Sequence, residues 1–294
     1  MSISCIRRIP VVWVEHSWQI QTSTFRSIMK IPVAHYALIA ALASPMSAFA
    51  LVGGAGPSPS SADSPWVGVG SLSVNGSLFT ATLIAPGYVL TAAHVVTGAE
   101  PSKIRFQLNA GSSDAISASK VFINPGYNGR TSANVPGDPT VHSDLAIIKL
   151  SSDVPSNVPV WQVFTGGLLS HDLNFVSFGG STTTRTTGEN MVDRVYVDGT
   201  GTPQTYLFDY DGPDLSTNWL GAGTLGENRE ANLVGGDSGS AAFVNVNGQW
   251  KLAGINTFRV TVALGTSGII GTGGGGVILS SYLPWITSVL TPVP

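Results

Sequence analysis

The chain has 294 residues, of which 35 are glycine and only 11% are charged, and its net charge is -3. This composition favours a β-rich globular protein of one large or two small domains. The basic residues are scattered, which argues against the basic patch of a nucleic-acid-binding protein. A hydrophobic fraction of 43% is ample for a core and argues against disorder beyond the chain ends.

The N-terminal region is typical of a secretory signal peptide. Met29 and the lysine after it precede an apolar run over 31–43, and a small-x-small sequence ends at Ala50. This pattern predicts a signal over about 29–50 with cleavage after Ala50. The run is shorter than the ~20 residues of a membrane-spanning helix, so no membrane span is expected in the mature chain. Translation starts at Met1 or Met29, and the product is expected to be secreted, into a periplasm or out of the cell.

The first strands follow this region. Short runs of Val, Ile, Leu, Thr and Phe alternate with clusters of Gly, Asn, Pro and Ser, which predicts short antiparallel strands. Asn75-Gly76 predicts a two-residue hairpin, because both positions tolerate a positive φ. A short helical turn is expected at 92–96. The strands predicted in this half are 67–74, 78–83, 87–91, 103–108, 118–123 and 145–150.

A proline-containing linker is predicted at 151–159, and the second half again shows short apolar runs between turn-forming clusters. The tail over 282–290 is the one predicted helix there, with Trp285 and Ile286 on its apolar face. The glycine-dense stretch 265–276 is expected to be a mobile surface loop, because glycine is costly to order. The strands predicted in this half are 174–180, 192–197, 206–210, 240–246 and 250–257.

Three short strings contain groups suited to nucleophilic catalysis. His94 follows Thr-Ala-Ala, Asp144 precedes an apolar strand, and Ser238 lies in Gly-Gly-Asp-Ser-Gly-Ser. A serine hydroxyl needs an imidazole to accept its proton and a buried carboxylate to orient that imidazole. The glycines allow a tight turn that aims two backbone NH groups at one point. The alternatives are a structural histidine, a carboxylate satisfied by backbone NH groups, and a simple glycine turn.

The order His, Asp, Ser resembles the chymotrypsin/trypsin family of serine proteases, whereas subtilisin-like enzymes and α/β-hydrolases have other orders. The resemblance covers about residues 51–290. It implies an all-β fold, a chymotrypsin-like double six-stranded antiparallel β-barrel with a C-terminal helix. The expected parts are an N-terminal extension plus signal peptide at 1–50, a first barrel with His94 and Asp144 at 51–155, and a second barrel with Ser238 and the terminal helix at 156–294.

The resemblance implies a role for each group. His94 would be the general base, Asp144 its orienting acid and Ser238 the nucleophile, with the backbone NH groups of Gly236 and Ser238 as the oxyanion hole. No metal or organic cofactor is expected. The only cysteine, Cys5, precedes the signal, so the mature chain would have no disulfide. Eukaryotic members usually have several, so a bacterial origin is favoured.

The predicted new N-terminus also resembles the family. Cleavage would expose Leu51-Val52-Gly53-Gly54, similar to the Ile-Val-Gly-Gly that begins an activated member. In the family the freed ammonium pairs with the aspartate before the nucleophile, here Asp237. Signal peptidase would then activate the enzyme. The alternative is that residues 51–62 form a flexible leader.

The resemblance further implies a substrate pocket. Asn232 would form its base, Thr257, Phe258 and Arg259 one wall, and Gly276 the opposite wall. Because Asn232 is not an acid, the usual counter-charge for an Arg or Lys substrate is missing. Arg259 stands where glycine is usual, so it could pair with an acidic side chain, block the pocket or face solvent.

The function implied by these residues is that of a secreted serine endopeptidase that hydrolyses peptide bonds through an acyl-enzyme on Ser238. Its partners would be a polypeptide substrate and a possible protein inhibitor. Two other functions stay open. One is a catalytically silent, protease-like binding or adhesion module, and the other is an esterase with narrow peptide activity.

Overall fold

The computed structural model describes residues 50–54, 56–58, 64–108, 115–129, 142–179, 184–221, 223–226, 228–261 and 270–291, which all belong to one compact unit. Cys5, both candidate start methionines and the predicted signal peptide before Ala50 lie outside these residues. No helix in the described ranges is long and apolar enough to cross a lipid bilayer.

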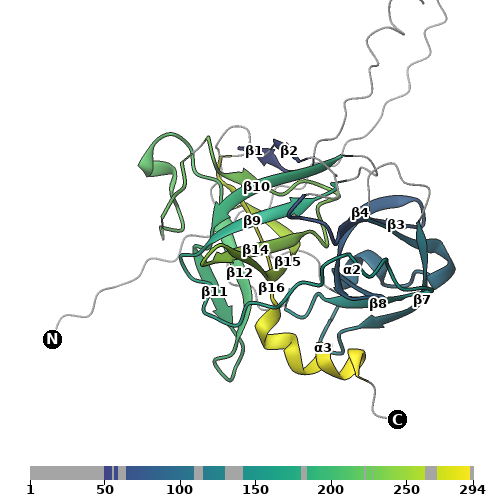
Figure 1. Cartoon of the computed structure of the whole chain (residues 1–294). Helices are drawn as coiled ribbons and strands as arrows, with labels where there is room; N and C mark the ends of the chain where they lie inside the picture. Colours follow the sequence, from purple (N-terminus) through teal and green to yellow (C-terminus); the bar gives the residue numbers. More distant parts are fainter. Residues whose placement is uncertain are drawn as a thin grey trace, which may run out of the picture. The chain divides into compact units, whose positions relative to one another are not determined.

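Six antiparallel strands of the first half close into a barrel, in the order β3-β4-β5-β8-β7-β6. Figure 1 shows its strands β3, β4, β7 and β8 on the right. Its interior is filled by buried apolar side chains, among them Leu72, Leu83 and Phe106. Each such side chain stabilises the fold by about 1.5–3 kcal/mol when fully buried. The strands are β3 Val69–Val74, β4 Ser77–Ala85, β5 Tyr88–Thr91, β6 Ile104–Gln107, β7 Ile116–Ile123 and β8 Ala146–Leu150.

The predicted hairpin joins β3 to β4. Asn75 and Gly76 form its two-residue turn with φ angles of 51° and 86°. Both residues therefore adopt the left-handed conformation that this pair favours, and the prediction is confirmed. The short helix α2, Ala93–Val96, follows β5 and lies where the sequence predicted a helical turn.

The second half forms an eight-stranded antiparallel sheet in the order β11-β12-β16-β15-β14-β9-β10-β2. Its strands are β2 Gly56–Ser58, β9 Asp172–Ser177, β10 Arg185–Met191, β11 Arg194–Val197, β12 Pro203–Asp209, β14 Ala241–Val246, β15 Gln249–Thr261 and β16 Thr272–Ile278. A separate two-stranded sheet pairs β1 Val52–Gly53 with β13 Ala231–Asn232.

This larger sheet curls into the second barrel. The strands β10 and β11 stand near opposite ends of the order, yet only Val192 and Asp193 separate them in the chain. The two ends must therefore meet. The Asn190 side chain bridges the junction, because its Nδ2 donates to the carbonyl oxygens of Asp209 and Ala231 at 2.9 and 3.0 Å. The expected double-barrel fold is confirmed, but this second sheet has eight strands, with β2 at one edge, instead of the expected six.

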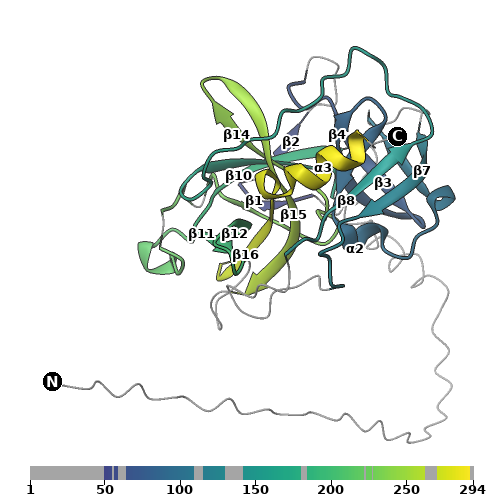
Figure 2. The same ribbon diagram turned by 90° about the horizontal axis from the view of Figure 1, so that it is seen from below.

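One apolar cluster joins the two barrels. Trp66 and Leu90 of the first half and Phe243 of the second lie in the same buried group. The short 3-10 helix η6, Leu279–Tyr282, leads into helix α3, Leu283–Leu290, whose Ile286 is buried in this cluster (Figure 2). The predicted terminal helix is thus present, with Trp285 packed against the same cluster.

The prediction of a surface loop at 265–276 is wrong for the part that the structure describes. Residues 272–278 form β16, which lies between β12 and β15 and is almost wholly buried. A Cβ atom at Gly273, Gly275 or Gly276 would lie 2.0–2.2 Å from a backbone oxygen of a neighbouring strand. The glycines are therefore needed for close packing of backbones. Residues 265–269 lie outside the described residues.

Candidate active site

The turn that presents Ser238 lies between β13 and β14 and contacts the first barrel. Gly236 and Gly239 have φ angles of 99° and 82°, which glycine adopts without strain. A Cβ at Gly239 would lie 2.2 Å from Thr91 Oγ1 and 2.3 Å from the Thr80 carbonyl oxygen. The backbone NH of Thr80 also donates to the Ser238 carbonyl at 3.4 Å. The serine is therefore held against strands of the other barrel.

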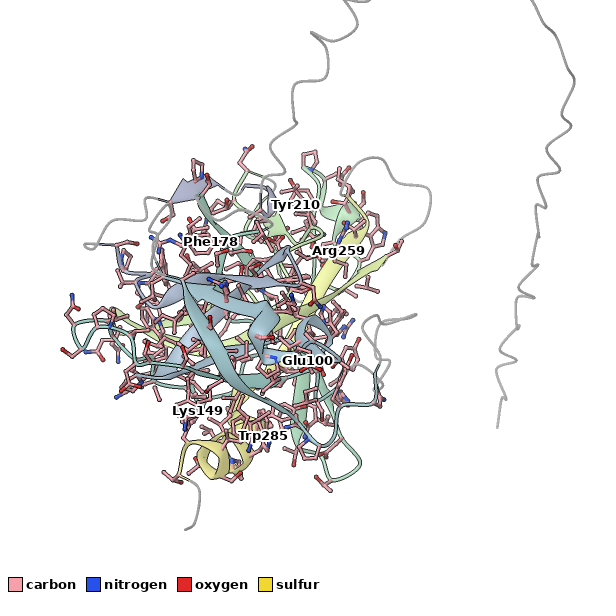
Figure 3. The ribbon with its side chains drawn as sticks, turned by 90° about the vertical axis from the view of Figure 1, so that its right-hand side faces the viewer. Glu100, Lys149, Phe178, Tyr210, Arg259 and Trp285 are labelled. Atoms are coloured by element: carbon pink, nitrogen blue, oxygen red, sulfur yellow. The ribbon has the colours of Figure 1, made fainter. Side chains whose placement is uncertain are left out.

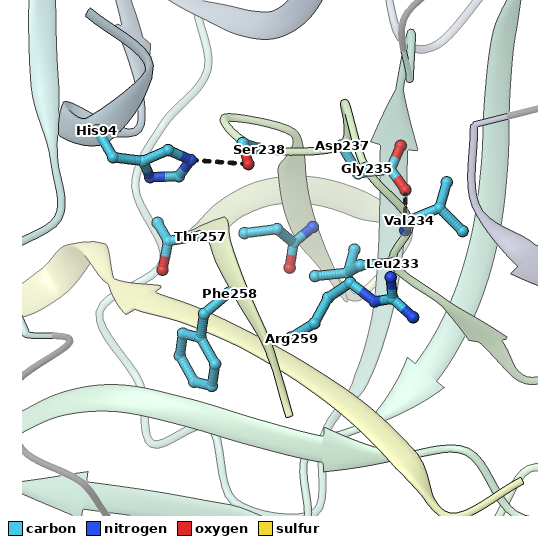
Figure 4. A pocket seen from close by; sticks show the side chains of 10 residues that line it. His94, Leu233, Val234, Gly235, Asp237, Ser238, Thr257, Phe258 and Arg259 are labelled. Atoms are coloured by element: carbon cyan, nitrogen blue, oxygen red, sulfur yellow. Dashed lines mark hydrogen bonds between the residues drawn. The ribbon is translucent and has the colours of Figure 1, made fainter. Parts of the chain in front are cut away.

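The three side chains predicted to act together do lie together. His94 is on α2, and Asp144 lies two residues before the first residue of the strand β8. The His94 Nδ1 atom is 2.7 Å from Asp144 Oδ2, and its Nε2 atom is 2.8 Å from Ser238 Oγ (Figure 4). The backbone NH of His94 also donates to Asp144 Oδ1 at 2.9 Å.

These contacts fix the direction in which a proton can move. Asp144 is 1% exposed and, as an ionised carboxylate, can only accept hydrogen bonds. The His94 Nδ1 atom must therefore carry the hydrogen in that pair, which leaves the Nε2 lone pair facing the Ser238 hydroxyl. The arrangement can remove a proton from Ser238 and hold the resulting imidazolium beside a negative charge.

The predicted partners Leu51 and Asp237 are also in contact. The Leu51 nitrogen lies 3.1 Å from Asp237 Oδ2, and the carboxylate is completely buried. Ser177 Oγ donates to Asp237 Oδ1 at 2.6 Å, and the Val234 NH donates to Oδ2 at 2.7 Å. Burial raises the pKa of Asp237 to about 6, although the Ser177 hydrogen bond lowers it. In the described chain Ala50 still precedes Leu51 and is itself 3% exposed.

A cavity of about 270 Å³ opens beside Ser238 and His94. Three predicted pocket residues, Thr257, Phe258 and Arg259, line it (Figure 4). The sequence did not single out three other residues that line it, namely Leu233, Val234 and Asn256. Each of them is the immediate chain neighbour of a predicted residue or of the glycines before Ser238. That proximity was the only available signal.

Asn232 and Gly276 are not among the residues that line this cavity. Asn232 is fully buried in β13, and its Nδ2 donates to Thr272 Oγ1 at 2.8 Å. Gly276 is buried in β16 between Asn256 of β15 and Tyr206 of β12. Both are therefore enclosed by neighbouring strands.

Four buried carboxylates lie near β13, the strand that pairs with β1. Asp193, Asp209, Asp211 and Glu230 are each no more than 3% exposed. The NH of Asp209 donates to Asp193 Oδ2 at 3.0 Å, and that of Asp211 to Glu230 Oε2 at 2.8 Å. Burial raises the pKa of Asp193 to about 8, that of Asp211 to about 7, and also that of Asp209. In the described ranges no three His, Cys, Asp or Glu side chains are placed to hold a metal.

Asp193→Asn is expected to reduce the pH dependence of stability. The folded protein binds extra protons at this cluster between the ordinary aspartate pKa of 3.8 and about 8, so the free energy of unfolding should fall as the pH rises through that range. The wild type should lose up to roughly 1 kcal/mol per pH unit from one such group, and the variant less. Urea unfolding between about pH 5 and 8 measures this. Parallel curves for the two proteins, with exposed Asp172→Asn as the control, would contradict it.

A family model described as Trypsin matches residues 52–286, which is most of the chain. The chain belongs to the trypsin family of serine proteases. No curated protein matches it. As a trypsin-family member it is a serine-type endopeptidase, a hydrolase whose substrates are polypeptides.

Proposed function

We propose that this trypsin-family protein cleaves peptide bonds with Ser238 as nucleophile, His94 as general base and Asp144 as orienting acid. The supporting observation is the hydrogen-bonded series from Asp144 through His94 to Ser238, with distances of 2.7 and 2.8 Å. A chance grouping of surface residues would not hydrogen-bond a buried carboxylate to Nδ1, the imidazole nitrogen that faces away from the serine.

The geometry supports a two-step reaction. Ser238 Oγ attacks the substrate carbonyl while His94 Nε2 takes its proton, and the carbonyl oxygen becomes an oxyanion. His94 then donates that proton to the leaving amine, and the C–N bond breaks to leave an acyl-enzyme. Water attacks the ester in the second step, again with His94 as base. Asp144 stays ionised and stabilises the imidazolium in both steps.

The oxyanion hole is proposed at the backbone NH groups of Gly236 and Ser238. Neither NH donates a hydrogen bond to another residue in the described part of the chain, so both are available to a ligand. The positive φ of Gly236 sets the turn in which they lie. Losing one such donor typically lowers the rate about 100- to 1000-fold.

We further propose that the protein is secreted and that cleavage after Ala50 completes the site. The family match starts at Val52, directly after Leu51, and the strand β1 pairs with β13 next to the cavity. Cleavage would turn the Leu51 nitrogen into an ammonium beside the buried carboxylate of Asp237. A buried carboxylate without a cation costs several kcal/mol, so this pairing would stabilise the active arrangement.

Covalent labelling with a fluorophosphonate probe tests the proposal. The wild type should be labelled at Ser238, and Ser238→Ala should lose the label, because the probe reports an activated serine. Ser288→Ala, an exposed serine on α3, is the control and should keep it. A wild type that resists labelling would favour the silent binding module. A labelled protein that cleaves esters but no peptide would favour the esterase.

A further inference from the structure

Among the described residues, Arg259 is the only lysine or arginine that lines the cavity beside Ser238. It is exposed on β15, opposite Gly274 of β16. Its side chain extends along the cavity toward Leu233 (Figure 4). In Figure 3 Arg259 and Trp285 of α3 lie at opposite ends of the described unit, so the helix does not cover it. Within the described residues the Arg259 guanidinium makes no hydrogen bond or salt bridge, although its charge lowers the pKa of the buried Asp237 carboxylate.

Among the described residues, the cavity has no exposed acidic side chain that could pair with a cationic substrate. Asp237 is the only acid that lines it in the part of the chain that the structure describes, and that carboxylate is fully buried. Its oxygens already accept hydrogen bonds from Ser177, Val234 and Leu51. A substrate ammonium or guanidinium would therefore lose its hydration without gaining an exposed partner.

Apart from His94, the remaining lining groups carry no charge. The Asn256 side chain is committed on both sides, because its Oδ1 accepts from Tyr206 and its Nδ2 donates to Ser240. Leu233 and Phe258 are buried apolar residues of the lining. A short aliphatic stem can pack against them, and a carboxylate at its end can meet the guanidinium in the two-pronged geometry that arginine favours.

We propose that Arg259 determines specificity and selects substrates in which the residue contributing the cleaved carbonyl has a carboxylate side chain, glutamate or aspartate. This proposal rests on the proposed function, because it needs Ser238 to be the nucleophile. The alternative hypothesis is that Arg259 only fills the cavity and excludes every large substrate side chain equally.

Matched peptides that differ only at that residue separate the two. The set contains Glu, Gln, Ala and Lys, and kcat/KM is measured for the wild type, Arg259→Gln and Arg259→Glu. The wild type should prefer Glu over Gln by about 10- to 100-fold, because Gln has the same shape without the charge. Arg259→Gln should lose most of that preference, chiefly through a lower kcat/KM for the Glu peptide. Arg259→Glu should prefer Lys over Glu.

Two controls sharpen the result. Arg194→Gln removes an exposed arginine outside the cavity and should keep the wild-type preference. Raising the salt concentration should lower the Glu-to-Gln ratio of the wild type, because salt screens exposed charges. An equal rise for all four peptides in Arg259→Gln would overturn the proposal in favour of a blocking residue.

Labelling of Ser238 distinguishes the two levels of failure. A labelled, peptide-cleaving wild type that does not prefer Glu over Gln overturns the role of Arg259 alone. A wild type that is neither labelled nor active on any peptide overturns the proposed function and this inference together.

Discussion

Replacing His94 by alanine is expected to lower kcat/KM by about 10⁴- to 10⁶-fold without unfolding the protein. The imidazole is the only base within hydrogen-bond distance of Ser238 Oγ among the described residues, at 2.8 Å. Without it the hydroxyl keeps its proton at neutral pH. Because the two residues act as a unit, His94→Ala combined with Ser238→Ala should be little worse than either change alone.

Asp144→Asn should lower kcat/KM by about 10⁴-fold for a different reason. The carboxylate accepts from both the backbone NH and the Nδ1 atom of His94. An amide can accept through only one of its two ends, so it favours the tautomer in which Nε2 carries the hydrogen. That tautomer cannot accept the proton of Ser238.

Initial rates on a chromogenic peptide measure both changes, and thermal unfolding checks that the variants remain folded. His171→Ala is the control, because His171 is exposed and outside the cavity. A His94→Ala protein within 10-fold of the wild type would contradict the assigned role.

The second large effect is expected at the N-terminus. Protein that begins at Leu51 should be about 100- to 1000-fold more active than protein that keeps Ala50, the loss typical of a missing oxyanion donor. With Ala50 present, the Leu51 nitrogen already lies 3.1 Å from Asp237, but as a neutral amide. Cleavage would therefore change the charge at this position more than the contact itself.

The pH dependence of stability gives an independent readout. With Ala50 attached, burial raises the pKa of Asp237 from 3.8 to about 6, so the free energy of unfolding should fall as the pH rises through that range. An ammonium at Leu51 should lower this pKa and reduce the fall. The measurements are kcat/KM and urea unfolding of the two forms, with one extra residue at the C-terminus as the control. Equal rates for both forms would rule out activation by cleavage.

The elements that the sequence predicted well depend on local signals. The Asn75-Gly76 turn and the strings around His94 and Ser238 contain their own conformational information, and the apolar strand after Asp144 indicates where the carboxylate enters the interior. In the structure His94 lies within hydrogen-bond distance of both Asp144 and Ser238.

The elements that the sequence did not predict depend on contacts between residues far apart in the sequence. The strand β10 has no apolar alternation, and its Arg185 and Asn190 are buried because other segments supply their hydrogen bonds. The strand β16 was missed because a run of glycines has no strand preference of its own. A register shift in β15 between Asn256 and Phe258 changes which side chains face the cavity, and no sequence pattern indicated it.

The close approach of Gly239 to Thr80 and Thr91 has a consequence for how the enzyme fails. The proposed nucleophile belongs to one barrel, whereas the proposed base and acid belong to the other, so proton transfer depends on the alignment of the two barrels. A shift of about an ångström between them would silence the enzyme while each core kept its full secondary structure. Loss of turnover should therefore be detected earlier than loss of the spectroscopic signal from secondary structure.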